Sequence, residues 1–182
     1  MGSYAMLMFS QLLPTKSITP SNQLSYVARF QFEEQGLLVS GDAGCVDFSP
    51  SRGNKFYKDL LNAPLPLHVI QVAHHGGNNA KFYNVLLKAK YDEQSAESFL
   101  LLSHASNDGH RPSDIFGQFV ANLRKDVDNV QILFTGVPRK KYVKDFRTLI
   151  AQRTEPRMPA GDIRLSFDGH NWKVRKHAIE VL

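Results

Sequence analysis

Two stretches of the sequence, "LLVSGDAG" (Leu37–Gly44) and "VIQVAHHGGNN" (Val69–Asn79), follow one pattern. In each, a run of strand-forming residues stops at glycine beside a side chain that can bind a metal ion: Asp42 in the first, His74 and His75 in the second. Aliphatic runs bounded by glycine and asparagine predict β-strands. Because the loops that follow strand carboxyl ends carry the sites of open α/β sheets, we expect these three side chains to lie at one edge of a sheet.

The surrounding sequence alternates between strand and helix patterns. Runs rich in β-formers on either side of "EEQG" predict a hairpin with Gly36 at its turn, leading to Asp42. Further strands are predicted at 67–73, 98–103 and 129–136, and a terminal hairpin at 161–176 that turns at Asp168 and Gly169. Apolar residues at helical spacing predict helices at 55–63, 80–92, 114–127 and 140–153, the third of them capped by Ser113. This alternation predicts an α/β fold with helices packed on a mixed sheet.

Length and composition predict a single soluble domain over residues 1–182. Hydrophobic residues make up 42% and charged residues 21%, and no segment approaches the roughly 18 consecutive apolar residues of a membrane span. The N-terminus has no signal-peptide pattern, so we expect a cytoplasmic protein that does not enter a membrane. Cys45 is the only cysteine, so a disulfide or a thiolate zinc cluster within one chain is excluded. Any metal site must therefore use histidine and aspartate.

The chain carries a formal charge of +5, and part of this excess lies in its C-terminal half. Lys140, Lys141, Lys144 and Arg147 lie at one-turn spacing on the helix predicted there, where they would form one positive stripe. Such a stripe favours contact with phosphate groups or nucleic acid. An ordinary solvated surface is the alternative interpretation.

A third strand-end loop, "HASNDGHRPS", holds Asn107 and His110. Histidine titrates near neutral pH, so His110 is a candidate to contact a phosphate oxygen or to protonate a leaving group; supporting the start of the next helix is the alternative. In a di-metal hydrolase, a carboxylate bridges the cations and imidazoles fix their geometry. Asp42 suits the bridge, although an aspartate at this position can also cap a loop. His74 and His75 would face opposite ways on a regular strand, so both reach one ion only if the glycines after them turn the chain.

The order of these segments resembles the second half of a metallo-β-lactamase-fold hydrolase of the competence-type (ComEC-like) branch. The resemblance rests on "NQLSYVARF", "LLVSGD", "VIQVAHHGG", "LLSHASNDGHRPS" and "SFDGHNW", which follow one another as in that branch over nearly the whole chain. It implies the C-terminal part of an αββα sandwich, in a metal-dependent hydrolase that cleaves phosphodiesters or related esters with zinc or manganese. It further implies that Asp42 bridges the metal ions, that His74 is a ligand and His75 a second or alternative ligand. Asn107 and His110 would lie on the substrate side as catalytic residues.

The sequence departs from this family in one large respect: HxHxDH, the motif of the N-terminal half that supplies most of the ligands, is absent. Arg111 also stands where the family has proline, and Asn78 where it has serine. A catalytic zinc normally needs three protein ligands. We therefore expect a poor hydrolase unless a complementary chain carrying HxHxDH, an added N-terminal half or a second copy in a homodimer completes the site.

A fragment, a split subunit and a degenerate module are all compatible with a missing N-terminal half. The alternative function is a non-catalytic α/β module that binds nucleic acid or an acidic partner through its basic C-terminal half. The two functions differ over Asp42: the metal-dependent hydrolase requires its carboxylate, whereas the binding module does not.

Overall fold

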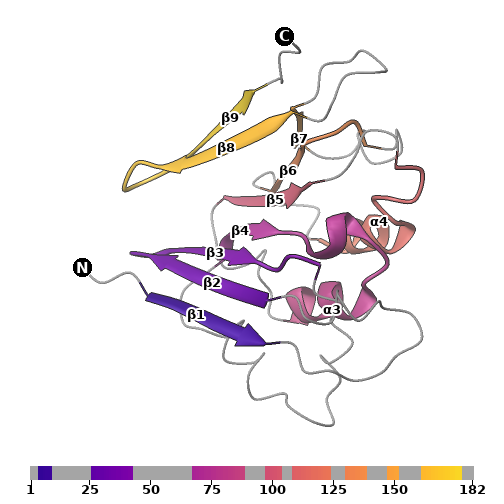
Figure 1. Cartoon of the computed structure of the whole chain (residues 1–182), viewed down its shortest axis with the longest axis horizontal. Helices are drawn as coiled ribbons and strands as arrows, with labels where there is room; N and C mark the ends of the chain where they lie inside the picture. Colours follow the sequence, from indigo (N-terminus) through magenta and orange to yellow (C-terminus); the bar gives the residue numbers. More distant parts are fainter. Residues whose placement is uncertain are drawn as a thin grey trace.

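The computed structural model describes residues 4–9, 26–42, 67–88, 97–103, 108–123, 130–138, 147–151 and 161–177. Within them a seven-stranded sheet runs in the order β1 to β7, so that neighbours in the sheet are also neighbours in sequence (Figure 1). The strands are β1 (Tyr4–Phe9), β2 (Tyr26–Phe32), β3 (Gln35–Val39), β4 (Leu67–Gln71), β5 (Ser98–Leu102), β6 (Val130–Phe134) and β7 (Arg147–Ile150). β1, β2 and β3 pair antiparallel, and β3 through β7 pair parallel. The predicted mixed sheet of an α/β fold is therefore confirmed.

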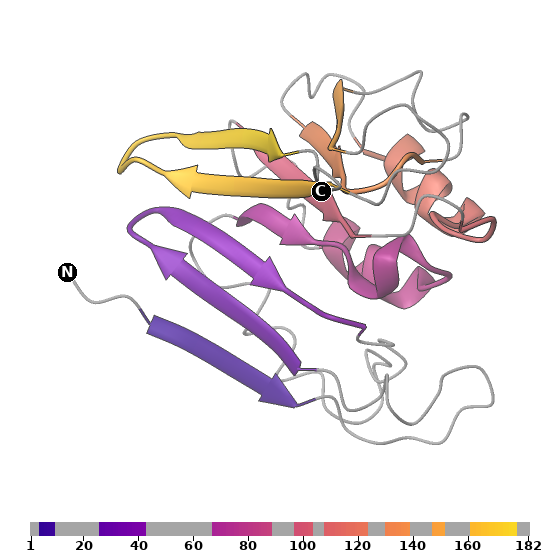
Figure 2. The ribbon, with the colours of Figure 1, turned by 45° about the horizontal axis from the view of Figure 1, so that its top comes forward.

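The two faces of this sheet are covered by different layers (Figure 2). Helices α3 (Ala80–Lys88) and α4 (Asp114–Ala121) cover one face, where their apolar side chains share a core cluster with Ile70, Leu100 and Ile132. A separate hairpin of β8 (Asp162–Phe167) and β9 (Trp172–His177) covers the other face. There Ile163, Leu165, Trp172 and Val174 pack against Val69, Phe99 and Leu133. Because both faces are covered, the central parallel strands are nearly unbroken apolar runs.

Several local predictions are confirmed where the structure describes them. Helix α3 begins at Ala80 as expected, and Ser113 caps α4 by accepting a hydrogen bond from the Phe116 N–H at 3.2 Å. The terminal hairpin turns after Phe167, where the Asp168 carboxylate accepts from the N–H groups of His170 and Asn171. The helix predicted at 55–63 lies outside the described residues. Among the helices that the structure does describe, none has the length and apolar character needed to cross a membrane.

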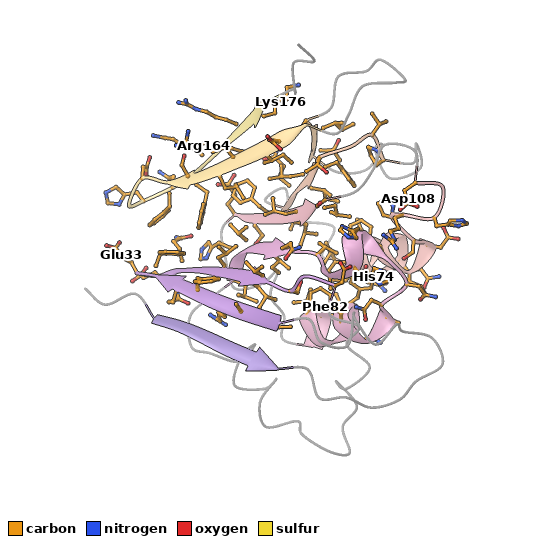
Figure 3. All side chains as sticks on the ribbon, viewed as in Figure 1. Glu33, His74, Phe82, Asp108, Arg164 and Lys176 are labelled. Carbon is orange, nitrogen blue, oxygen red and sulfur yellow. The ribbon has the colours of Figure 1, made fainter. Side chains whose placement is uncertain are left out.

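The prediction that Gly36 forms the turn between β2 and β3 is wrong. Gly36 lies inside β3 and pairs with Gln31, and the turn is made by Glu33 and Glu34. A two-residue hairpin loop needs left-handed backbone, and Glu33 adopts it with φ 52° despite its Cβ. Pairing of the flanking strands sets this register and outweighs the local preference for glycine. Figure 3 shows Glu33 at the end of the sheet remote from His74.

The predicted helix over 140–153 is also wrong at Arg147–Ile150, which form strand β7. β7 pairs parallel with β6, Ile132 facing Thr148 and Phe134 facing Ile150. The segment contains Thr and Ile, which suit strands, and the edge of β6 offers backbone groups that need partners; this pairing overrides the helical spacing. Arg147 therefore does not lie on a helical stripe. Lys140, Lys141 and Lys144 lie outside the described residues.

Candidate functional site

The ends of β3 and β4 are tied together by one side chain. The amide oxygen of Gln71 accepts from the N–H groups of Ser40 and Gly41, at 3.1 and 3.0 Å, and the Ser40 hydroxyl donates to the Gln71 carbonyl. Ser40 is fully buried. Asp42 follows directly, so its backbone leaves the sheet from a fixed point beside the end of β4.

The two histidines lie in a tight turn that follows β4. Ala73–Gly76 form a 3₁₀ segment in which His74 and His75 both have left-handed backbone, with φ of 52° and 53°. This conformation is uncommon for residues with a Cβ, although histidine adopts it more often than most. The His74 N–H donates to the Gly41 carbonyl at 3.0 Å, and the Gly77 N–H donates to the His74 carbonyl at 2.8 Å. The chain therefore turns at the histidines, and they no longer alternate as they would on a strand.

This turn brings His75 into contact with Asp42. The Nε2 of His75 lies 3.2 Å from Oδ1 of Asp42, and both side chains are about one-third exposed. On the other side of the ring, Nδ1 of His75 contacts the carbonyl oxygen of Ser103, the residue after β5. The ends of three neighbouring strands, β3, β4 and β5, therefore meet at this imidazole.

The Asp42 and His75 pair fits two adjacent positions around a metal ion. Two ligands of one tetrahedral zinc, each at about 2.0 to 2.1 Å, lie about 3.3 Å apart, and the observed separation is 3.2 Å. A metal-binding histidine usually donates its other ring N–H to a carbonyl or carboxylate. The contact between Nδ1 and Ser103 supplies that support, and it leaves the Nε2 lone pair directed toward the side of Asp42.

His74 makes a different contact from His75. Its Nε2 lies 3.2 Å from a terminal guanidinium nitrogen of Arg111, which can only donate, so the ring nitrogen is the acceptor. Burial lowers the pKa of His74, the positive charge of Arg111 lowers it further, and Asp42 acts in the opposite direction. Among the residues that the structure describes, no group of three histidine, cysteine, aspartate or glutamate side chains could hold a metal ion. Asp42 and His75 alone therefore do not make a metal site, and any ion held there would need ligands from elsewhere.

In the third loop, Asp108 contacts Arg111 through both its carboxylate oxygens. Asp108 Oδ1 accepts from the N–H groups of His110 and Arg111, at 2.9 and 3.1 Å, and Oδ2 lies 3.6 Å from Arg111 Nε. Burial alone would raise the pKa of Asp108, but the hydrogen bond from His110 and the charge of Arg111 lower it. The Ser113 N–H donates to the Gly76 carbonyl at 2.8 Å, which fixes this loop against the histidine turn. Figure 3 shows Asp108 and His74 at the same end of the molecule.

The structure thus gathers some of the sequence-predicted site residues and leaves others apart. Asp42, His74 and His75 meet at the strand ends, whereas the His110 side chain is exposed. Asn107 lies outside the described residues. Asp108 belongs to the third strand-end loop picked out from the sequence but had no role assigned, and Gln71 and the Ser103 carbonyl were missed. Gln71 had a signal, since it is a polar residue inside the apolar run "VIQVA", whereas a backbone acceptor leaves no mark in a sequence.

Arg111 was noted in the sequence only because it replaces a proline, yet it is the residue that contacts His74.

Comparisons with known proteins found no relative of this chain. No protein-family model matches the sequence, and neither the curated proteins nor the solved structures gave a match.

Proposed function

We propose that this chain is the C-terminal part of a metal-dependent hydrolase that cleaves phosphodiesters, related to the metallo-β-lactamase fold. The observation that supports this most is the contact between Asp42 and His75, 3.2 Å apart with the far side of the imidazole held by Ser103. Zinc, or manganese in its place, would bind between these two side chains. The remaining ligands come from a complementary chain carrying HxHxDH, from an N-terminal half, or from a second copy.

The layer order supports the same proposal. An αββα sandwich places a second sheet on the face of the first sheet that its helices leave free, and the β8–β9 hairpin occupies that face here. Within the described part of the chain, this second sheet has two strands. An N-terminal half would extend it and would bring its own ligands to the same edge.

When bound, the metal would activate a water molecule and polarise the phosphoryl oxygen. This chain's own part is to hold and orient. Asp42 and His75 would hold the ion beside the strand ends, where Gln71 fixes the backbone just before Asp42 and the Ser103 carbonyl holds the His75 ring. Arg111 and the exposed His110 lie on the adjacent loop, where an anionic substrate would approach. Alone, with two protein ligands, the chain binds metal weakly and turns over slowly.

Metal binding and hydrolysis test the proposal directly. Zinc content after dialysis and turnover of bis-p-nitrophenyl phosphate should be measured for the wild type, for Asp42→Ala and for Asp162→Ala. The last is a matched control, since Asp162 is exposed at the start of β8 and its loss changes the charge equally. We expect zinc binding to fall in Asp42→Ala only, and a chain bearing HxHxDH to raise turnover. Equal zinc binding by Asp42→Ala and the wild type would refute the metal site.

A second candidate function is binding of nucleic acid through the C-terminal half, and one observation favours it. The outer face of the β8–β9 hairpin exposes Arg164, Lys173 and Arg175, and Arg164 and Arg175 pair directly across the strands. Like charges at directly opposed positions destabilise a hairpin, and a phosphate backbone would offset that repulsion. A two-stranded ribbon also fits the DNA major groove.

Salt dependence of DNA binding tests this second function. In fluorescence anisotropy with a labelled DNA duplex, the slope of log affinity against log salt should flatten by about 1.8 in Arg164→Glu/Arg175→Glu, since each phosphate contact contributes about 0.9. The charge-retaining Arg164→Lys/Arg175→Lys variant is the control and should keep the wild-type slope. Wild-type binding that does not change with salt would remove this candidate.

A further inference from the structure

The edge of the seven-stranded sheet at β1 is uncharged and unprotected. β1 (Tyr4–Phe9) pairs with β2 in a continuous register, and within the described part of the chain no strand pairs with its other side (Figure 1). Its sequence, YAMLMF, contains no charged residue and no proline. Proteins usually protect an edge strand with lysine, proline or a bulge, because its free backbone N–H and C=O groups can pair with another chain. β1 has none of these features.

The register of the sheet shows which backbone groups of β1 face this edge. The turn between β2 and β3 has two residues, so the pair that closes it, Phe32 and Gln35, exchanges both backbone hydrogen bonds. Along an antiparallel strand, the backbone groups of successive residues point alternately to the two neighbouring strands. Since Phe32 points toward β3, the residues of β2 that point toward β1 are Val27, Arg29 and Gln31.

Two hydrogen bonds on the far side of β3 agree with this alternation. Gly36 pairs with Gln31, so the Gly36 N–H must point away from β2, and it donates to Nδ1 of His68 on β4 at 3.3 Å. The Ser40 N–H, just after β3, points to the same side and donates to the Gln71 amide oxygen at 3.1 Å. The alternation deduced from the turn therefore holds along the whole of β3.

Applied to β1, the same alternation separates two sets of residues. Those whose backbone groups bind β2 lie opposite Gln31, Arg29 and Val27, and are Tyr4, Met6 and Met8. The residues that point their N–H and C=O groups toward the free edge are therefore Ala5, Leu7 and Phe9. These three positions are symmetric about Leu7, so a two-fold rotation at Leu7 places the set opposite itself.

We propose that β1 is a dimer interface, at which it pairs antiparallel with β1 of a second copy about a two-fold axis at Leu7. Ala5 of each copy then pairs with Phe9 of the other, and Leu7 with Leu7, each pair exchanging two backbone hydrogen bonds. Because both copies use the same surface, the contact closes as a dimer. β1 brings no like charges together when it pairs with itself, whereas β9 would oppose Lys173 and Arg175 of two copies.

This dimer does not depend on the proposed metal site. A two-fold axis at Leu7 turns the strands of the two copies in opposite directions, so the strand ends that carry Asp42 and His75 lie at opposite edges of the joined sheet. The candidate sites of the two copies therefore share no residues. Further ligands for the proposed metal ion would have to come from a source other than this dimer.

Sedimentation equilibrium of the full chain tests the interface. We expect the wild type to form a dimer and Leu7→Lys to weaken it by at least about tenfold, since the two lysines would face each other across the axis. Leu7→Pro removes an N–H that faces the edge and should weaken the dimer while the chain stays folded. Its matched control, Met6→Pro, removes an N–H that binds β2 and should lower the free energy of unfolding instead. Ser166→Lys adds the same charge at an exposed position of β8 and should leave the dimer unchanged.

Hydrogen exchange followed by NMR tests the alternation itself. In the dimer, the N–H groups of Ala5, Met6, Met8 and Phe9 should all exchange slowly. When the wild type is diluted to the monomer, the N–H groups of Ala5 and Phe9 should exchange at least about tenfold faster, whereas those of Met6 and Met8 stay protected by β2. Exchange that rises equally at all four positions would refute the deduced register.

Three results of the sedimentation experiment would overturn the proposal. The first is a wild type that stays monomeric at every concentration at which it is soluble. The second is a dimer that survives in Leu7→Lys and, where that variant is folded, in Leu7→Pro. The third is loss of the dimer in Ser166→Lys as well, which would assign the effect to net charge and not to β1. None of these measurements involves zinc, so failure of the metal site would leave the result for β1 unchanged.

Discussion

Replacing Gly76 with alanine tests whether the histidine turn has the geometry described above. Gly76 has φ +77°, and a Cβ added to it would lie 2.7 Å from Leu102 Cδ2 and 3.1 Å from Pro112 Cβ. The left-handed backbone costs a residue with a Cβ about 1 to 2 kcal/mol, and forcing an extra carbon into a packed site costs about 1 to 3 kcal/mol. We therefore expect Gly76→Ala to lower the free energy of unfolding by about 2 to 5 kcal/mol.

Two other glycines separate these contributions. Gly169 also has positive φ, at +99°, but a Cβ there meets nothing within 4 Å, and Gly109 combines open space with no positive φ. The free energy of unfolding of Gly169→Ala should therefore fall only by the cost of left-handed backbone, about 1 to 2 kcal/mol. Gly109→Ala should be neutral, or more stable by up to about 1 kcal/mol, because alanine restricts the unfolded chain.

Urea unfolding monitored by circular dichroism measures all three variants against the wild type. With a slope of about 2 kcal/mol per molar urea, typical of a small protein, Gly76→Ala should unfold at a urea concentration about 1 to 2.5 M lower than the wild type. The order of stability is the sharp prediction: Gly109→Ala above Gly169→Ala, and Gly169→Ala above Gly76→Ala. Unfolding of Gly76→Ala at the same urea concentration as Gly109→Ala would refute the close packing of this turn against Leu102 and Pro112.

Further predictions concern the Ser113 cap of α4, the hydrogen bonds from Gln71 to the end of β3, and the pH dependence of stability. Ser113→Ala removes the acceptor for the Phe116 N–H and should lower the free energy of unfolding by about 1 kcal/mol, measured by urea unfolding. Ser113→Asp keeps a capping oxygen and should retain most of the wild-type stability. Gln71→Met leaves the N–H groups of Ser40 and Gly41 without their acceptor and should lower the free energy of unfolding by about 1 to 3 kcal/mol. Its zinc affinity should fall as well. An unchanged urea midpoint would contradict the role of Gln71 in joining the ends of β3 and β4. The pKa of His74 is lowered on folding, so the unfolded chain binds that proton more tightly, and stability should decrease as pH falls below the ordinary histidine value. His74→Gln should show a smaller loss over the same interval, when unfolding free energies are compared across pH, and an identical profile would contradict this assignment.

The sequence predicted the strands of this fold better than its turns and edges. The runs that became β4, β5 and β6 are buried on both faces, so their composition alone identifies them. The errors at Gly36 and at Arg147–Ile150 have a common cause. In both, pairing with a neighbouring strand decided the conformation, across a short hairpin for Gly36 and with the more distant β6 for Arg147–Ile150.

The sequence predicts which edge of the sheet carries the candidate site, but not which side chains contact one another there. Strand ends in a parallel sheet meet at one edge, and this general rule is enough to predict that Asp42 and the two histidines lie near one another. Which histidine contacts the carboxylate depended on the left-handed turn at His74 and His75. A regular strand would have sent them to opposite faces, and the sequence marks the turn only through the glycines that follow.

The contacts around the candidate site divide its residues into those held at the strand ends and those held by side chains alone. Asp42 follows a strand end that the Gln71 side chain ties to β4, and His75 is held by the Ser103 carbonyl, so contacts at the strand ends position both residues. Within the described part of the chain, the Arg111 guanidinium contacts the side chains of His74 and Asp108, so these contacts can change while the strands stay paired.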